Sequence, residues 1–307
     1  MSDKIFEPQY PAQDYTKRPN SRALLSPIYD WTFKAMFSQE TEESNIALKS
    51  FISAAIGREI KSVTVKSAQP PKERKKQKSI TFDVCAEFDN GELSEIEMQA
   101  WPQNYDYPTR AEILAARLLS SNAKKGNKWS GPKVYQISIL NFHCQEDDKS
   151  ELSWYTLRDD SGKKLAGKLN VIFIDLVTIR QKLGTPAGEL NPIEKWGLFL
   201  SYIDDKDKKQ YIEELVRSEK GLMAAGKILR NISKSDDNWY WQNSVFIAEC
   251  DRNTIQENLK NKAMEEGKQQ KAKEDAKAYY ANGVSIEIIA KSQNITIEQA
   301  KDLIFKG

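Results

Sequence analysis

Histidine and cysteine are scarce in this chain, and their scarcity excludes whole classes of chemistry. His143 is the single histidine among 307 residues, so histidine-rich metal sites and most serine–histidine catalysis are excluded for this chain alone. The three cysteines, Cys85, Cys144 and Cys250, are far apart and form no CxxC pair. This argues against a disulfide framework or a cysteine zinc site and favours a reducing compartment. Any metal chemistry would therefore use carboxylates, which suit hard ions such as magnesium or manganese.

Long apolar runs and a strong net charge are also lacking. No apolar stretch approaches the length of a membrane span, and the first residues lack the basic-then-apolar pattern of a secretory signal. The net charge is +2, so the whole-chain charge does not indicate a nucleic-acid binder, although a local basic patch is compatible with it. The length suffices for one large domain or a domain with appendages. We expect a soluble cytoplasmic protein without membrane contact.

The hydrophobic patterning predicts strands placed between helices. Apolar residues at helical spacing begin after Pro27, and Gly57 ends a second helix. Pro108 at the start and Gly126 after the end mark a third helix. The order indicates a sheet flanked by helices, an α/β core of roughly 150 residues. The expected elements are helices over 27–37, 42–56 and 108–125 and strands over 60–65, 82–88, 92–99, 133–142 and 169–179.

Beyond Pro192 the pattern is helical. Residues 253–277 are highly charged with few apolar positions, which we interpret as an extended, solvated helix. The final segment resembles two short helices, and Thr296 with Gln299 forms a capping box for the second. We expect its small core to contain Ile288, Ile289, Ile295, Ile297, Ala300 and Leu303. The expected division is an arm (1–25), an α/β domain (26–185), a helical region (186–252), a charged helix (253–280) and a small helix-turn-helix-like tail (281–307).

The stretch over 82–99, FDVCAEFDNGELSEIEMQ, predicts a hairpin whose register follows from its apolar faces. Even-numbered positions are mainly apolar on both arms, and directly opposite residues of an antiparallel pair point to the same side, so even must pair with even. A two-residue Asn-Gly loop would pair Asp89 with Glu92 and mismatch the faces. A three-residue loop pairs Phe88 with Glu92. Gly91 then takes the left-handed position of a type I turn with a bulge.

This register places Asp83 opposite Glu97, with Cβ atoms roughly 5 Å apart. Two like charges at that distance repel unless a cation neutralises them, and Gln99 lies two residues on along the same face. The alternative is an ordinary hairpin with acids on its exposed face. Two features favour a metal site. The arms are central in an α/β pattern, where both faces should be covered, and the acids lack lysine or threonine partners.

An Asp on one strand followed by Glu-x-Gln on the next resembles the core motif of PD-(D/E)XK nucleases, in the variant where Gln replaces Lys. More closely, the chain resembles the transposase or recombination-promoting nuclease branch of that superfamily. Phe82 stands where proline is common, a departure that removes no proposed ligand. The likeness covers most of residues 27–307. The matching pieces are PIYDWTFKAMF (27–37), the hairpin, TRAEILAARLL (109–119), EKWGLFL (194–200) and the tail over 283–304.

The resemblance implies a restriction-endonuclease-like core, a mixed sheet flanked by helices, with a helical C-terminal region. It also implies metal-dependent hydrolysis of phosphodiester bonds in DNA. Asp83, Glu97 and the backbone carbonyl of Met98 would bind Mg²⁺ or Mn²⁺, which would lower the pKa of a bound water and neutralise charge on the phosphate. Gln99 would orient that water or bond a phosphate oxygen, without the positive charge of a lysine.

Other residues near these motifs each have two interpretations. Asp30 is either a further metal ligand or an acid stabilised by its position at a helix N-terminus. Arg110 either contacts a DNA phosphate or is structural. Lys34 is a candidate DNA contact within the resembled first helix. The basic loop over 72–78 either touches phosphate or is simply solvated.

Three hypotheses follow for the whole chain. The first is a magnesium-dependent DNA endonuclease associated with mobile elements or recombination, which the complete set of Asp83, Glu97 and Gln99 favours. The second is a catalytically weak or inactive protein that keeps the nuclease fold for DNA binding or assembly. The third is a pure scaffold. Self-association would use the C-terminal helices, and the sequence leaves both DNA and RNA open as substrates.

Overall fold

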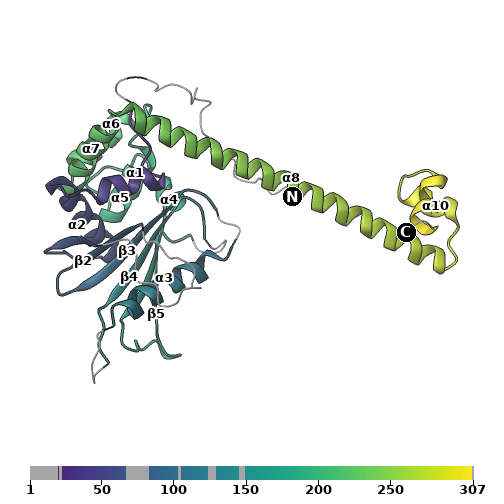
Figure 1. The fold of residues 1–307 in the computed structure, drawn as a ribbon, viewed down its shortest axis with the longest axis horizontal. Coiled ribbons are helices and arrows are strands. Elements are labelled where there is room, and N and C mark those ends of the chain that lie inside the picture. Colours follow the sequence, from purple (N-terminus) through teal and green to yellow (C-terminus); the bar gives the residue numbers. More distant parts are fainter. Residues whose placement is uncertain are drawn as a thin grey trace. The chain divides into compact units, whose positions relative to one another are not determined.

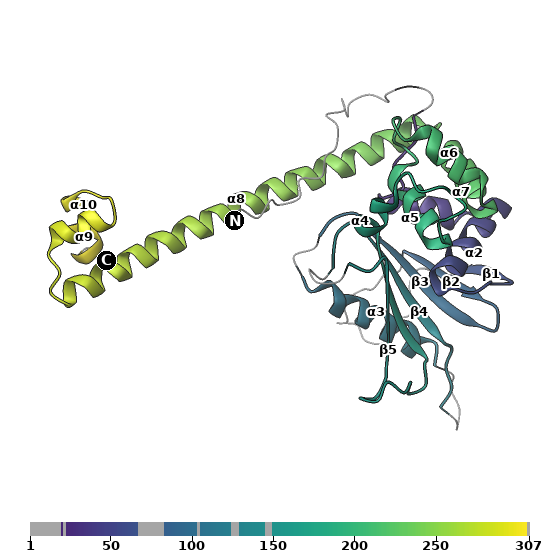
Figure 2. The same ribbon diagram turned by 180° about the vertical axis from the view of Figure 1, so that it is seen from behind.

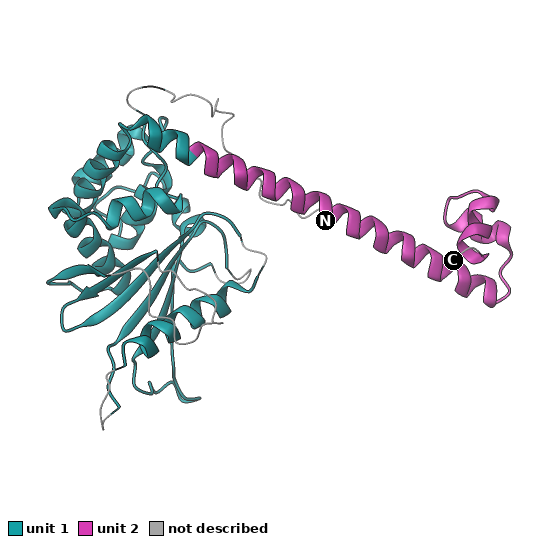
Figure 3. Ribbon diagram, in the orientation of Figure 1, with its two compact units in different colours: residues 1–242 teal, residues 243–307 magenta. Residues whose placement is uncertain are grey.

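The computed structural model describes residue 20 and residues 23–66, 83–102, 105–123, 129–144 and 149–305. It contains two compact units, residues 1–242 and 243–307 (Figure 3). We describe each unit by itself. The basic loop over 72–78, Phe82 and Gly126, which the sequence singled out, lie outside the described residues.

A mixed sheet forms the centre of the first unit (Figures 1 and 2). Its six strands within the described residues have the order β1-β2-β3-β4-β6-β5. The central pairs β3–β4 and β4–β6 are parallel, whereas the remaining pairs are antiparallel. The central strands are buried along almost their whole length, as a covered parallel sheet requires. The strands are β1 (Val63–Lys66), β2 (Val84–Phe88), β3 (Glu92–Gln99), β4 (Val134–Leu140), β5 (Leu152–Thr156) and β6 (Leu169–Asp175).

Helix α3 (Tyr107–Ser121) covers one face of this sheet. Its Leu114 and Leu118 pack with Cys85 and Leu93 of the hairpin, so the odd-numbered face of β3 lies beneath α3. Burial of such side chains stabilises the contact by about 1.5–3 kcal/mol each. Glu95 and Glu97 share this face, which explains why they are buried rather than exposed to solvent.

The remaining helices of the first unit surround an aromatic cluster. Trp196 contacts Phe37, Phe51 and Phe199 with ring centroids 5.5–5.8 Å apart. Helix α7 (Lys220–Ile232) lies so close to α2 (Glu42–Ile56) that a Cβ on Gly221 would overlap the side chain of Ser50. Glycine, which has no Cβ, is the residue that fits at this contact. These elements are α1 (Asp30–Phe37), α2 (Glu42–Ile56), α4 (Leu176–Ile179), the 3₁₀-helix η1 (Arg180–Lys182), α5 (Pro192–Tyr202), α6 (Lys209–Arg217) and α7 (Lys220–Ile232).

The second unit consists of most of α8 (Asp236–Ala281), α9 (Ile286–Ser292) and α10 (Ile297–Phe305). The predicted capping box is confirmed, because Thr296 N donates to Gln299 Oε1 at 2.9 Å and Gln299 N donates to Thr296 Oγ1 at 3.1 Å. The predicted core is partly wrong. Ile288 and Ile297 are exposed, because the two short helices turn Ile289 and Ile304 toward Ala276 of α8.

The α/β class predicted from the sequence is confirmed, and the two main differences in the sheet concern β5 and β6. The edge strand β5 was not predicted, since its residues are half-buried or exposed and show no clear alternation. The strand expected over 169–179 ends at Asp175, whose carboxylate accepts a hydrogen bond from Thr178 N at 2.9 Å and starts α4. Among the helices described, none is long and apolar enough to cross a membrane.

Candidate active site

The β2–β3 hairpin has the register that its apolar faces predicted. Val84 pairs with Ile96 and Phe88 pairs with Glu92, which leaves a three-residue loop. Gly91 takes the expected left-handed conformation, with φ of 81°. The pairing of the two strands ends at Val84 and Ile96. Asp83 and Glu97, which the sequence predicted to face each other, therefore lie one position beyond it.

The loop itself differs from the predicted type I turn. Asp89 also has a positive φ, 47°, where a type I turn requires a negative value. Its carboxylate pairs with Arg58 at 2.7 Å and accepts a hydrogen bond from Lys61 N at 2.7 Å. These contacts hold Asp89 in a conformation that costs a non-glycine residue energy, and they depend on a distant segment that the local sequence does not show.

Asp83 lies immediately before β2 and is only 12% exposed. Lys34 of α1 approaches it at 3.0 Å, and the same ammonium lies 2.9 Å from Asp30. Burial, together with the carboxylates of Asp30 and Glu97, raises the pKa of Asp83 to about 8, although Lys34 opposes the rise. The structure thus brings Asp30, Lys34 and Asp83 together. Asp30 is half exposed at the first residue of its helix.

Glu97 lies on β3 and is 2% exposed. Its carboxylate accepts a hydrogen bond from Tyr107 Oη at 2.9 Å and forms an ion pair with Arg110. Both partners come from the first turns of α3, where residues three apart share a face. Each acid therefore pairs with one cation of a neighbouring helix, Arg110 for Glu97 and Lys34 for Asp83, and Asp30 shares Lys34.

A row of buried polar side chains continues from Glu97 across the sheet. Glu95 is beside Gln136 in the parallel register, and Glu97 is beside Ser138. Ser138 Oγ lies 2.9 Å from Tyr107 Oη and 2.8 Å from Gln136 Nε2. These residues were not predicted as site residues. The available signal was that Gln136 and Ser138 interrupt an apolar strand on one face.

Glu95 is fully buried and its carboxyl group is poorly satisfied. Within the described residues, neither carboxyl oxygen makes a hydrogen bond of ordinary geometry. Burial, followed by the charges of Glu97 and Asp83, raises its pKa well above the ordinary value, and nearby Gln136 and the Asp83 backbone only partly oppose this. Glu95 is therefore a third acid of this site, on the same face of β3 as Glu97.

Gln99 and Met98 end the same strand. Gln99 is half-buried, and its backbone carbonyl accepts a hydrogen bond from Asn141 N at 3.0 Å on the β4 side. Because successive residues of a strand direct their backbone groups to opposite sides, the Met98 carbonyl is directed to the β2 side. The Gln99 side chain shares the face of Glu97.

The chemistry of these donors suits a hard divalent cation, which prefers carboxylate and carbonyl oxygens. Glu97 supplies a buried carboxylate and Asp83 one that is 12% exposed, and the poorly satisfied Glu95 carboxyl is close enough to interact with both electrostatically. Nevertheless, in the parts of the chain that the structure describes, no three acidic, histidine or cysteine side chains are grouped closely enough to hold an ion. A metal ion would have to replace Lys34 and Arg110 beside the carboxylates.

The mixed sheet flanked by helices and the helical C-terminal region define an α/β protein with a nuclease-like fold. Residues 27–258 match the family model for PD-(D/E)XK nuclease family transposases. The chain belongs to this family, which confirms the resemblance and supports a function of the nuclease or transposase type. No curated protein and no solved structure gives a significant match.

We expect the metal-free protein to lose stability as the pH rises from about 4 to about 8. The pKa of Asp83 is about 8 in the folded protein, against an ordinary value of 3.8. Between these two pKa values the folded state binds more protons than the unfolded state. The stabilisation from protonated Asp83 is therefore complete below the lower pKa and is lost as the pH rises through the upper pKa. A difference of one pKa unit between the folded and unfolded states corresponds to about 1.4 kcal/mol. The expected decrease in the free energy of unfolding is therefore on the order of a few kcal/mol.

Urea denaturation of the metal-free protein at several pH values measures this effect. Asp83→Asn should reduce the dependence and leave the part that Glu95 contributes, whereas Glu87→Gln should preserve it, because Glu87 lies on the same hairpin in an exposed pair with Lys66 at 2.8 Å. Equal slopes for Asp83→Asn and the wild type would contradict the prediction.

Proposed function

We propose that this protein is a metal-dependent DNA endonuclease that hydrolyses phosphodiester bonds in transposition or recombination. The observation that carries the proposal is the group of Asp30, Asp83 and Glu97 at the end of one hairpin, where Lys34 is shared by Asp30 and Asp83 and Arg110 pairs with Glu97. Three carboxylates with two cations leave an excess of negative charge, which a divalent cation would balance. Family membership supports the assignment to nucleases.

Asp83, Glu97 and the Met98 carbonyl would hold Mg²⁺ or Mn²⁺, with Asp30 as a further candidate ligand. The ion would supply a bound water of lowered pKa and neutralise charge on the scissile phosphate. Tyr107 holds one oxygen of Glu97 in place through its hydrogen bond. The Gln99 amide would orient the water or donate a hydrogen bond to a phosphate oxygen.

Lys34 and Arg110 would have a second role in this mechanism. If a metal ion occupied the carboxylates, the positive charges of Lys34 and Arg110 would be free to contact DNA phosphates. Phosphate contacts of this kind position DNA without reading its sequence.

A supercoiled plasmid incubated with the protein tests the proposal. We expect nicking with Mg²⁺ or Mn²⁺ and none with EDTA. A single-stranded RNA of matched length, assayed in parallel, reports whether the substrate is DNA or RNA. No cleavage in either metal would overturn the proposal.

The alternative is a nuclease-fold protein that binds DNA or serves in assembly without efficient cleavage. One observation favours it: Lys34 and Arg110 already pair with both carboxylates. Such a protein would bind DNA with an affinity that falls steeply with salt, and the same plasmid would remain uncut.

A further inference from the structure

A cavity of about 390 Å³ lies beside the candidate active site. It opens near the carboxyl ends of the parallel strands β3 and β4, the edge at which open α/β sheets bind ligands. Its volume is within the range of small-molecule sites. Tyr105, Tyr107 and Phe142 supply its aromatic lining, and the other lining residues include Asp106, His143 and Cys144.

Tyr107 joins this cavity to the carboxylates. Its ring lines the cavity and packs edge-on against Phe142, with centroids 6.3 Å apart. Its hydroxyl lies 2.9 Å from Glu97 Oε2. A ligand in the cavity would therefore be separated from Glu97 by one tyrosine side chain.

The cavity also has an exposed aromatic residue, Tyr105, close to Arg110 of helix α3. Tyr105 is 48% exposed and lies close enough to Arg110 and Glu97 to interact with both electrostatically. An aromatic face beside an arginine combines a surface for stacking with a charge for phosphate. These are the two components with which proteins bind single-stranded nucleic acid.

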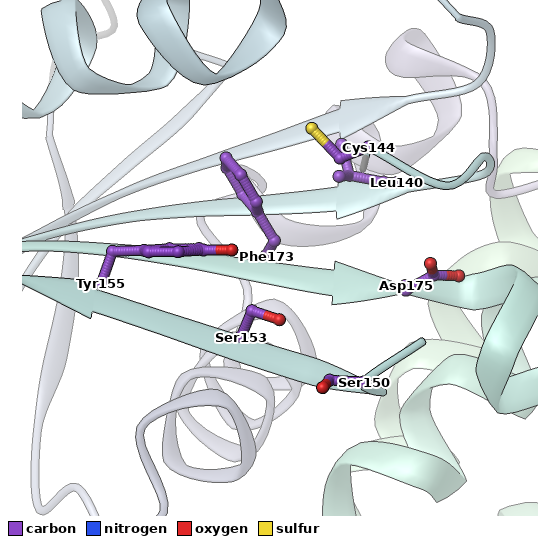
Figure 4. A pocket seen from close by; sticks show the side chains of 7 residues that line it. All are labelled: Leu140, Cys144, Ser150, Ser153, Tyr155, Phe173 and Asp175. Atoms are coloured by element: carbon purple, nitrogen blue, oxygen red, sulfur yellow. The ribbon is translucent and has the colours of Figure 1, made fainter. Parts of the chain in front are cut away.

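His143 supplies a polar group whose orientation is fixed. Its Nδ1 lies 2.6 Å from Asp175 Oδ2, and Asp175 is itself fixed by the hydrogen bond from Thr178 N. Figure 4 shows Asp175 at the end of its strand, and the neighbouring pocket there is only about 10 Å³, room for about one water. The larger cavity is thus the one that accepts an organic group.

We propose that the cavity binds a nucleobase extruded from the DNA beside the scissile phosphate. The inference rests on the proposed nuclease function and specifies its substrate class. The base would lie against Tyr105 and Phe142, with His143 at its polar edge. A base that remains stacked in an intact duplex cannot enter such a cavity, so the preferred substrate is DNA with an unpaired nucleotide at the cut, as in a single strand, a bulge or a frayed end.

Two oligonucleotides of equal length and phosphate content separate base binding from charge. One is oligothymidylate, and the other carries abasic tetrahydrofuran residues throughout. With EDTA present to prevent cleavage, we expect the wild type to bind oligothymidylate about 5- to 150-fold more tightly. Tyr105→Ala should remove most of this preference and leave the affinity for the abasic chain unchanged.

Trp129→Ala provides the matched control, since Trp129 is a fully exposed aromatic residue just before β4, at the opposite end of that strand. It should keep the full preference. Equal affinity of the wild type for the two oligonucleotides would overturn the inference, as would an unchanged preference in both Tyr105→Ala and Phe142→Ala.

Cleavage of oligothymidylate, whose bases are unpaired, with Mg²⁺ by the same preparations distinguishes this inference from the proposed function. Cleavage without base preference overturns the nucleobase site alone. Base preference without cleavage overturns the nuclease assignment and leaves the nucleobase site supported.

Discussion

Asp83→Asn and Glu97→Gln should each lower magnesium-dependent DNA cleavage by about 10³-fold or more. Each substitution removes one of the carboxylates proposed to hold the metal ion. An ion acting as a Lewis acid contributes several kcal/mol to the transition state, and each 1.36 kcal/mol is tenfold in rate. The double variant should be hardly worse than either single variant, because residues that hold one ion act as a unit. Plasmid nicking at saturating Mg²⁺ measures the effect.

Glu87→Gln is the control for this comparison, because it removes a carboxylate from the same hairpin at a position 43% exposed and paired with Lys66. It should cleave like the wild type. Gln99→Ala should lose less activity than the acid variants, since an amide contributes orientation rather than charge. If Asp83→Asn and Glu97→Gln nick DNA as fast as Glu87→Gln, the site has been assigned to the wrong residues.

Arg110→Met should lower the melting temperature of the metal-free protein by roughly 4–8 °C. Removing one partner of a buried ion pair costs about 3–5 kcal/mol, and the partial exposure of Arg110, 34%, reduces this to about 2 kcal/mol. A domain of this size loses about 2–4 °C per kcal/mol. Glu97 is then left unpaired and buried. Added Mg²⁺ should therefore stabilise Arg110→Met more than it stabilises the wild type.

Arg58→Met is the matched control for Arg110→Met, because it also removes a partly exposed arginine that pairs with carboxylates. Arg58 is 39% exposed and pairs with Asp89 and Glu92 at the turn of the same hairpin, at 2.7 and 2.8 Å. Its partners are more exposed than Glu97, so its loss should cost less and should not change the response to Mg²⁺. An equal response to Mg²⁺ in Arg110→Met and the wild type would show that the metal does not bind at Glu97.

The register of the hairpin could be predicted because it depends only on residues near one another in the sequence. Even-numbered apolar positions on both arms admit one loop length, and the structure pairs Val84 with Ile96 accordingly. Helix α2 was predicted with its correct bounds for the same reason, since Thr41 caps it and Gly57 ends it. Local alternation and local end signals were sufficient in both cases.

The polar row from Glu95 through Gln136 to Ser138 could not be predicted in this way. It arises because β4 lies parallel to β3 in one particular register, and no pattern within either strand specifies that register. The same holds for Tyr107 and Arg110, whose contacts with Glu97 depend on where α3 begins over the sheet. Nonlocal pairing, rather than local propensity, determined these parts of the site.

The first turn of α3 has a consequence for how this protein could be diversified. Tyr107 donates a hydrogen bond to Glu97 and also lines the aromatic cavity, and Arg110, three residues later, pairs with the same carboxylate. Under the proposed function and the proposed nucleobase site, a change at Tyr107 would therefore alter cleavage rate and substrate preference together. Exchange of the segment over 105–110 between members of the family would transfer both properties together, so substrate range would change in coupled steps rather than by independent tuning.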